Sequence, residues 1–83
     1  MKVLKFQASW CQPCKMLTRV MEDASDKITM PVEVIDIDEN QDMAIKYGIR
    51  GVPTLVIVDE EGKEVSRKSG MLMENQLMEF LSV

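Results

Sequence analysis

The stretch SWCQPCK, residues 9–15, holds both cysteines of the chain, two residues apart and between a tryptophan and a lysine. Such a pair can hold a metal, staple the fold or exchange disulfides. A structural zinc ion needs about four soft ligands, whereas the chain has two cysteines and no histidine. Only a metal shared between two chains would fit, and a disulfide closing so short a loop removes little entropy from the unfolded state. We therefore expect exchange chemistry, with no metal and no other bound cofactor.

The residues after the first cysteine predict a helix over residues 12–25. Pro13 suits the first helical turn, where its missing N–H would be unpaired in any case. Apolar side chains then recur at a helical spacing that indicates one buried stripe: Cys14, Leu17, Met21 and Ala24. The cysteine pair is thus expected at the beginning of a helix.

This position assigns different tasks to the two cysteines. The helix dipole and unpaired backbone N–H groups favour a thiolate at Cys11. Cys14 lies one turn further on, on the buried side, within reach of a mixed disulfide on Cys11. Exchange needs such a pair, an exposed nucleophile of low pKa and a sheltered resolving thiol. A C-x-x-C inside a strand–helix–strand pattern is a strong indication of redox chemistry.

Outward from the motif, apolar runs predict the strands. Residues 2–8 and 32–38 flank the helix, and the β-branched character of the second run favours an internal strand. Residues 55–59 form an unbroken apolar strand. After a turn at 60–63, residues 63–68 pair back as the second arm of a hairpin. The first two strands should be parallel, joined by a right-handed crossover.

Two further helices complete the pattern. Asn40 is placed to cap a short helix over residues 41–47 that ends at Gly48. Gly70 ends the hairpin, and the last helix carries Met73, Leu77, Phe80 and Leu81 on one face. The order β-α-β-α-β-β-α predicts an α/β fold in one domain, residues 1–83, with a four-stranded mixed sheet and three helices.

Composition excludes several functions. The net charge of −4 argues against nucleic-acid binding. The N-terminal residues contain no apolar run long enough for a signal peptide or a membrane span. Two cysteines are too few for the disulfide framework of a small secreted domain. The acidic run Asp36, Asp38, Glu39 and Asp42 lacks calcium-loop spacing and is interpreted as solvated. We expect a soluble, cytoplasmic protein, monomeric and without nucleic-acid or membrane partners.

The segments WCQPCK, KYGIRGVPTLVI and EEGKEVSRKSG together closely resemble the thioredoxin family, and the similarity extends over nearly the whole chain. The resemblance implies a dithiol–disulfide oxidoreductase that reduces disulfides of protein substrates and is itself re-reduced by a thioredoxin reductase or another thiol donor. Cys11 would be the nucleophile and Cys14 the resolving thiol. Pro53 would be the family's cis-proline, beside which the substrate chain lies. A shallow groove around Cys11 would be lined by Trp10, Gln12, Pro13, Ile37, Gly51, Val52, Gly70 and Met71.

The chain departs from the family pattern in several places. Cys11 comes too early for the strand and helix that precede the cysteines in full-length members, which predicts a trimmed fold, close in size to glutaredoxins, with a less protected sheet edge. Lys5 stands where the family has a buried aspartate, and Val34 where that aspartate has a lysine partner. Because burying a lysine is costly, we expect Lys5 to reach the surface or a rim opened by the trimming. Gln12 replaces a glycine and Gln7 a tryptophan.

Two other functions fit the same residues. A glutaredoxin-like protein of this size would be recycled by glutathione, although Trp10 and the loop around Pro53 favour thioredoxin. A non-catalytic thioredoxin-like subunit would dock the same apolar face onto a larger enzyme. That docking role should survive Cys11→Ser, whereas exchange should not.

Overall fold

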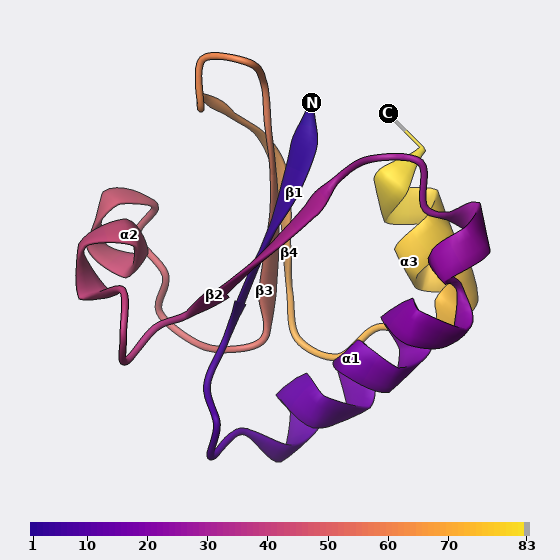
Figure 1. Cartoon of the computed structure of the whole chain (residues 1–83), viewed down its shortest axis with the longest axis horizontal. Coiled ribbons are helices and arrows are strands. Elements are labelled where there is room, and N and C mark those ends of the chain that lie inside the picture. Colours follow the sequence, from indigo (N-terminus) through magenta and orange to yellow (C-terminus); the bar gives the residue numbers. More distant parts are fainter. Residues whose placement is uncertain (83) are drawn as a thin grey trace.

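Four strands form one mixed sheet in the computed structural model, which describes residues 1–82 (Figure 1). The strands are β1 (Lys2–Gln7), β2 (Val32–Asp36), β3 (Thr54–Val58) and β4 (Glu64–Ser69). Their order is β2-β1-β3-β4. β1 runs parallel to β2 and antiparallel to β3, and β4 is antiparallel to β3. The predicted strand order along the chain and the mixed sheet are confirmed.

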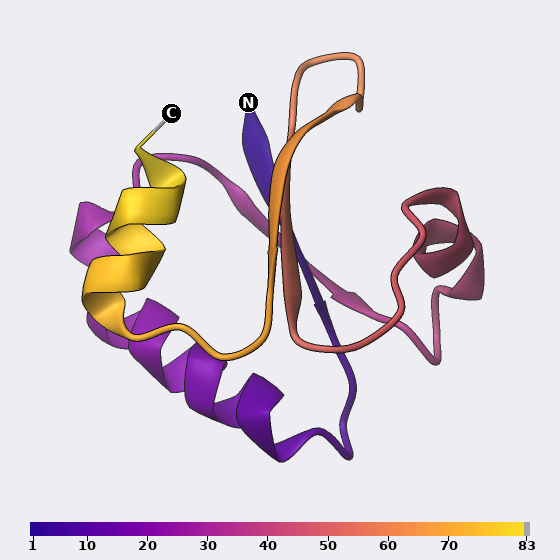
Figure 2. The ribbon, with the colours of Figure 1, turned by 180° about the vertical axis from the view of Figure 1, so that it is seen from behind.

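The helices cover both faces of this sheet. They are α1 (Gln12–Asp23), α2 (Gln41–Lys46) and α3 (Glu74–Leu81), and a 3₁₀ turn, η1 (Ser25–Lys27), follows α1. Helices α1 and α3 lie on one side of the sheet and α2 on the other, as the two opposite views show (Figures 1 and 2). The expected three helices are present within residues 1–82, and α1 ends two residues before the predicted boundary.

Alternation along β1 divides the core between the two faces. Val3 packs with the apolar side chains of α1 and α3, whereas Leu4 and Phe6 pack with residues around α2. The middle strand β3 is buried throughout, which explains its unbroken apolar sequence. At the end of the hairpin, Gly70 adopts a positive φ of 93°. This conformation is open to glycine at little cost, and it turns the chain from β4 towards α3.

The prediction that residues 32–38 form an internal strand is wrong. β2 lies at one edge of the sheet, and Val32 and Val34 are 37% and 56% exposed. Both side chains belong to the face of β2 that looks towards α1, where they line a pocket. An apolar, β-branched strand therefore marks an open edge here.

Asn40 does not cap α2 with its side chain as expected. Its amide Nδ2 instead donates to the carbonyl oxygen of Asp36, at 3.2 Å. The carboxylate of Asp36 accepts the backbone N–H groups of Asp38 and Glu39, at 2.8 and 3.3 Å. Asp36 thus orders the loop between β2 and α2, a role that aspartate commonly takes in turns.

Candidate active site

Cys11 and Cys14 are joined by a disulfide at the start of α1, with their Cα atoms 5.2 Å apart. Cys11 is the N-cap residue, and its Sγ accepts the backbone N–H of Cys14 at 3.1 Å. The sulfur of Cys11 therefore lies at the positive end of the helix dipole, where a negative charge is stabilised. The helix places both cysteines as the sequence pattern requires.

The expectation of an exposed Cys11 does not hold in this disulfide form. Cys11 is 4% exposed and Cys14 2%. Both pack with Ala8, and the half-buried side chains of Ile37 and Val52 cover them. Because side chains from the loop after β2 and the loop before β3 pack over the helix start, the difference in exposure between the two cysteines is smaller than helix position alone indicates.

The Val52–Pro53 loop lies directly against Cys11. The Val52–Pro53 peptide bond is cis, as the resemblance implies. The carbonyl oxygen of Val52 is 3.7 Å from Cys11 Sγ. Two hydrogen bonds hold the loop: Gly70 N–H donates to the Pro53 carbonyl at 2.8 Å, and Thr54 Oγ1 donates to the Gly51 carbonyl at 2.7 Å. The backbone beside the disulfide is therefore fixed from both ends.

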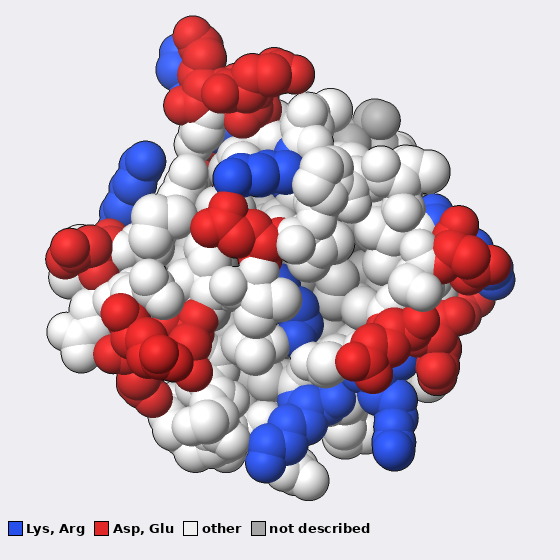
Figure 3. All heavy atoms as spheres, viewed as in Figure 1, with Lys and Arg blue, Asp and Glu red and all other residues white. Residues whose placement is uncertain are grey.

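Trp10 is the exposed aromatic residue of the site. Its side chain is 66% exposed, and its Nε1–H donates to Asp38 Oδ2 at 2.9 Å. Sequence reasoning missed Asp38, because it stands in an acidic run that has the ordinary composition of a solvated loop. The acidic side chains of this region gather beside α2 (Figure 3). Asp38 thus orients the indole ring while leaving most of it open.

The remaining residues expected in the groove lie at different depths. Gln12 and Pro13 are exposed at the start of α1, and Gly51 is exposed in the proline loop. Met71 is half-buried and packs against the core beneath α1 and α3. It also lines, together with Gln12, a hollow beside α1. The expected groove residues therefore come from four segments: the start of α1, the loop after β2, the loop before β3 and the chain after β4.

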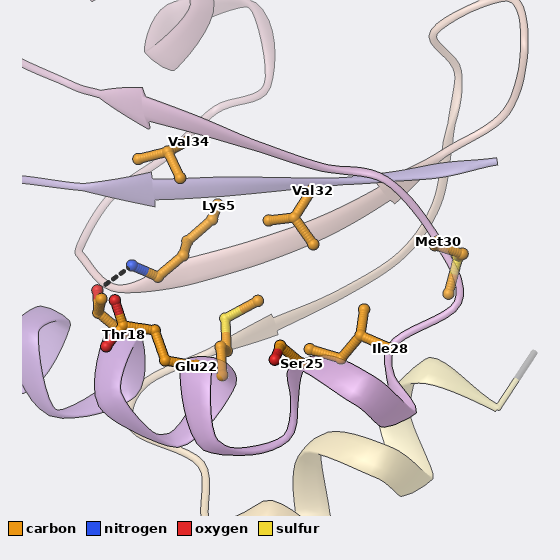
Figure 4. A pocket seen from close by; sticks show the side chains of 9 residues that line it. Lys5, Thr18, Glu22, Ser25, Ile28, Met30, Val32 and Val34 are labelled. Carbon is orange, nitrogen blue, oxygen red and sulfur yellow. Dashed lines mark hydrogen bonds between the residues drawn. The ribbon is translucent and has the colours of Figure 1, made fainter.

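One of our two alternatives was that Lys5 reaches the surface, and the structure does not show this. The residue is 3% exposed and points from β1 towards α1 (Figure 4). Its Nζ donates to Gln7 Oε1 and to Thr18 Oγ1, and Thr18 Oγ1 donates in turn to the carbonyl oxygen of Cys14 at 3.0 Å. Desolvation lowers the pKa of Lys5, and the carboxylate of Glu22 partly opposes that effect.

The other alternative placed Lys5 at a rim opened by the trimming, and the structure does place it in the wall of a pocket beside the edge strand β2. Lys5 lines a pocket of about 360 Å³ between α1 and β2. Figure 4 shows its walls, which come from α1, β2 and the connecting segment. They are mainly apolar: Met21, Ile28, Met30, Val32 and Val34, with Thr18, Glu22 and Ser25 as the polar members. Val34 pairs in register with Lys5 and supplies no counter-charge.

Within residues 1–82, no group of three or more histidine, cysteine, aspartate or glutamate side chains is placed to hold a metal ion. Over the same residues, no helix is both long enough and apolar enough to cross a membrane. The Cys11–Cys14 disulfide at the start of α1 is a chemically reactive feature of the site.

Comparison with known proteins identifies the family. A family profile described as Thioredoxin matches residues 1–83. The chain belongs to the thioredoxin family. It is 37% identical over 82 residues to a thioredoxin of Rickettsia bellii, covering 96% of this chain and 77% of the relative. With a thioredoxin of Pseudomonas aeruginosa the identity is 38%, over 95% of this chain and 74% of the relative.

Solved structures of thioredoxins have the same fold as this chain. A single-residue mutant of a thioredoxin from Halobacterium salinarum superposes with a TM-score of 0.85 at 40% identity, covering 95% of this chain and 69% of that one. The thioredoxin of Fasciola hepatica gives a TM-score of 0.85 at 34% identity, over 96% and 76% of the two chains. This thioredoxin-family chain, with its vicinal Cys11–Cys14 pair, is a dithiol–disulfide oxidoreductase. The predicted family, fold and type of reaction are confirmed.

Proposed function

We propose that this protein reduces protein disulfides in two steps. The Cys11 thiolate attacks one sulfur of a substrate disulfide, forming a mixed disulfide and releasing the other substrate sulfur as a thiolate. The Cys14 thiolate then attacks Cys11 Sγ, which forms the Cys11–Cys14 disulfide and releases the second substrate thiolate. Two electrons pass from the dithiol to the substrate, and the released thiolates take up protons from water.

The observation that carries this proposal is the position of Cys11 Sγ. It accepts a backbone N–H at the start of α1 and lies 3.7 Å from the carbonyl oxygen of Val52. The helix start favours the thiolate, and the backbone of the Val52–Pro53 loop offers hydrogen-bonding groups beside it. A substrate chain lying along this loop would bring its sulfur to Cys11.

The proposed substrate surface is the groove around the disulfide. Trp10 supplies an exposed ring that is already oriented by Asp38, and large aromatic side chains contribute strongly to polypeptide recognition. Pro53 positions the substrate backbone. The other members are Gln12, Pro13, Ile37, Gly51, Val52, Gly70 and Met71.

The proposed setting is the cytoplasm, with the protein acting as a monomeric single domain, residues 1–83, in electron transport and cell redox homeostasis. A reducing compartment drives the dithiol towards reduction of its substrates. A thioredoxin reductase, or another thiol donor, would return the disulfide to the dithiol. Members of the thioredoxin family generally act on disulfide-containing proteins with such a reductase, which supports this assignment.

The test is reduction of insulin disulfides with a small dithiol as donor. Wild type should accelerate the reaction, Cys11→Ser should be inactive, and Cys14→Ser should accumulate a mixed disulfide through Cys11. The Cys11→Ser/Cys14→Ser double variant is the trapping control. Turnover by wild type no faster than the donor alone would contradict the proposal. Recycling by glutathione in place of a reductase would favour the glutaredoxin-like alternative, and partner binding that survives Cys11→Ser would favour the docking subunit.

A further inference from the structure

Lys5 is the one charged side chain that is buried within residues 1–82. It lies in the middle of β1, paired with Val34 on one neighbouring strand and Leu55 on the other. Burying an ammonium costs free energy unless it is paired with an opposite charge and hydrogen-bonded. No carboxylate forms an ion pair with it among the described residues. Stability of the fold therefore does not explain why a lysine is buried at this position.

The hydrogen bonds of Lys5 lead to Cys14. Nζ donates to Thr18 Oγ1, and Thr18 is one helical turn after Cys14 and bonded to its carbonyl oxygen. The ammonium is thereby held beneath the first turns of α1, on the side to which the buried Cys14 also belongs. Gln7 fixes Nζ from the strand side. Two acceptors from different elements thus anchor the charge beneath the turn of α1 that begins at Cys14.

We propose that Lys5 is a positioning residue for the resolving step, whose ammonium stabilises the Cys14 thiolate through the interior of the protein. This inference rests on the roles proposed above for the two cysteines. Opposite charges attract more strongly in a site of low dielectric constant than in water. An ammonium nearby favours the charged form of a thiol, which offsets the desolvation that burial imposes on Cys14.

The other groups around Lys5 leave its charge largely uncompensated. β2 presents Val32 and Val34 to it, and β3 presents Leu55, none of which is charged. From α1, Glu22 lines the pocket and is exposed. The Glu22 carboxylate weakens the field at Cys14 from a distance but does not neutralise it. The attraction of an anion formed nearby would offset the desolvation that lowers the pKa of Lys5, so each charge favours the other.

The step balances without a further reactant. The Cys14 thiol releases its proton to solvent. The thiolate forms a bond to Cys11 Sγ, the bond between Cys11 and the substrate sulfur breaks, and the substrate leaves with the electron pair. Lys5 stays protonated throughout and exchanges no proton with the sulfurs.

The decisive experiment titrates Cys14 as the sole thiol, in a Cys11→Ser background, by its ultraviolet thiolate absorbance and its rate of alkylation. Lys5→Met keeps most of the length and an apolar stem and removes the charge. The midpoint of thiolate formation should rise by about one pH unit, and by about two in Lys5→Asp. Lys2→Met, on the opposite face of the same strand, should move it by less than about 0.3 pH unit. The rise in Lys5→Met should persist in about 1 M salt, because buried charges are screened weakly.

A second variant tests the anchoring. Thr18→Val keeps the shape of the side chain and removes the hydroxyl between Lys5 and Cys14, so the midpoint should rise by about half a pH unit. With Cys11 restored, Lys5→Met should release substrate from the mixed disulfide about tenfold more slowly at neutral pH, matching the lost thiolate. An unchanged Cys14 midpoint in Lys5→Met, in a variant that melts cooperatively, would overturn the inference. Because the titration needs no substrate, it gives its answer even where the proposed reductase activity fails.

Discussion

The two faces of the sheet differ in the helices that cover them and in the size of the apolar cluster beneath those helices. Beneath α1 and α3, eight buried hydrophobic residues form one cluster: Val3, Leu17, Met21, Leu55, Ile57, Leu72, Leu77 and Leu81. Beneath α2, which is six residues long, the buried cluster is Leu4, Phe6, Ile35, Tyr47, Val56 and Val58. Hydrogen bonds hold the shorter helix α2 and the residue after it against the hairpin. Tyr47 Oη donates to the Gly62 carbonyl at 2.7 Å, and Arg67 donates to the Tyr47 carbonyl.

The difference shows where this fold can carry a buried charge. Lys5 stands on the face with the larger apolar cluster, beside the cysteines. Hydrogen bonds to Gln7 and Thr18 hold the ammonium in place, which a charge acting on a neighbouring sulfur requires. The α2 face has no such charge among the described residues and connects instead to the tip of the β3–β4 hairpin. The larger apolar cluster and the buried charge thus lie on the same face of the sheet.

Truncation of a buried leucine should change the free energy of unfolding most, and doing so on each face of the sheet compares the packing beneath α1 and α3 with that beneath α2. Leu17→Ala, on α1, should lower the free energy of unfolding by about 4 kcal/mol, because the long helices cannot collapse into the space. Leu4→Ala, on the opposite face of β1, should lose about 3 kcal/mol, because the short α2 can move inward. Both side chains are almost fully buried, and urea unfolding measures both losses. A larger loss for Leu4→Ala would reverse the comparison.

Tyr47→Phe removes the hydroxyl that joins α2 to the hairpin and keeps the ring against Phe6. The free energy of unfolding should fall by about 1 kcal/mol, the usual value of one hydrogen bond. Insulin reduction at temperatures well below the melting transition should match wild type, because the tyrosine is on the far face of the sheet from Lys5. A loss of turnover in this folded variant would show that the two faces are coupled.

Lys5→Met should raise the free energy of unfolding at neutral pH, by less than about 1 kcal/mol because the hydrogen bonds to Gln7 and Thr18 offset part of the cost of burying the ammonium. The pKa of Lys5 is lowered from its usual 10.5, so the unfolded chain binds this proton more tightly than the folded one. The charge therefore destabilises the fold below the folded-state pKa, and the cost disappears as pH rises towards 10.5. Unfolding across pH 7 to 10.5 should show the gain of the variant shrinking; a gain independent of pH would assign it to packing alone.

The smallest effect is expected at Ile45 on the outer side of α2. This side chain is 77% exposed although it belongs to an apolar residue in a short helix. Ile45→Ser should change the free energy of unfolding by less than about 0.5 kcal/mol, as surface substitutions usually do. Thermal melts of the two proteins should nearly superpose. A loss comparable to that of Tyr47→Phe would mean that α2 is more deeply seated than its exposure indicates.

The parts of the fold that were predictable depend on neighbours along the chain. Pro13 and the apolar stripe after it mark the start of α1, and Gly48 and Gly70 end their elements with positive φ. The position of β2 was not predictable in this way. A β-branched run suits a central or an edge strand equally, and strand order is decided by pairings between distant segments.

The same limit applies to the candidate site. The cysteine pair and its helix start follow from local sequence, and Pro53 from the resemblance. The burial of Lys5 depends on Gln7 and Thr18 meeting its Nζ from two elements, and no spacing in the sequence reveals that meeting. The bond from Trp10 to Asp38 spans 28 positions, and Asp38 is indistinguishable in the sequence from the acidic residues around it.

Charged residues at the open edge of β2 disfavour self-association of the protein. Its outward backbone groups offer a template on which another extended chain could add, the usual origin of edge-to-edge aggregation. Between the exposed Val32 and Val34 stands Glu33, which is paired with Lys2 at 2.7 Å. An incoming strand would have to accommodate these charges beside its own backbone. Acidic residues in a largely apolar edge strand, Glu33 and Asp36, thus help to keep a reactive dithiol protein dispersed at the concentrations at which it must meet its substrates.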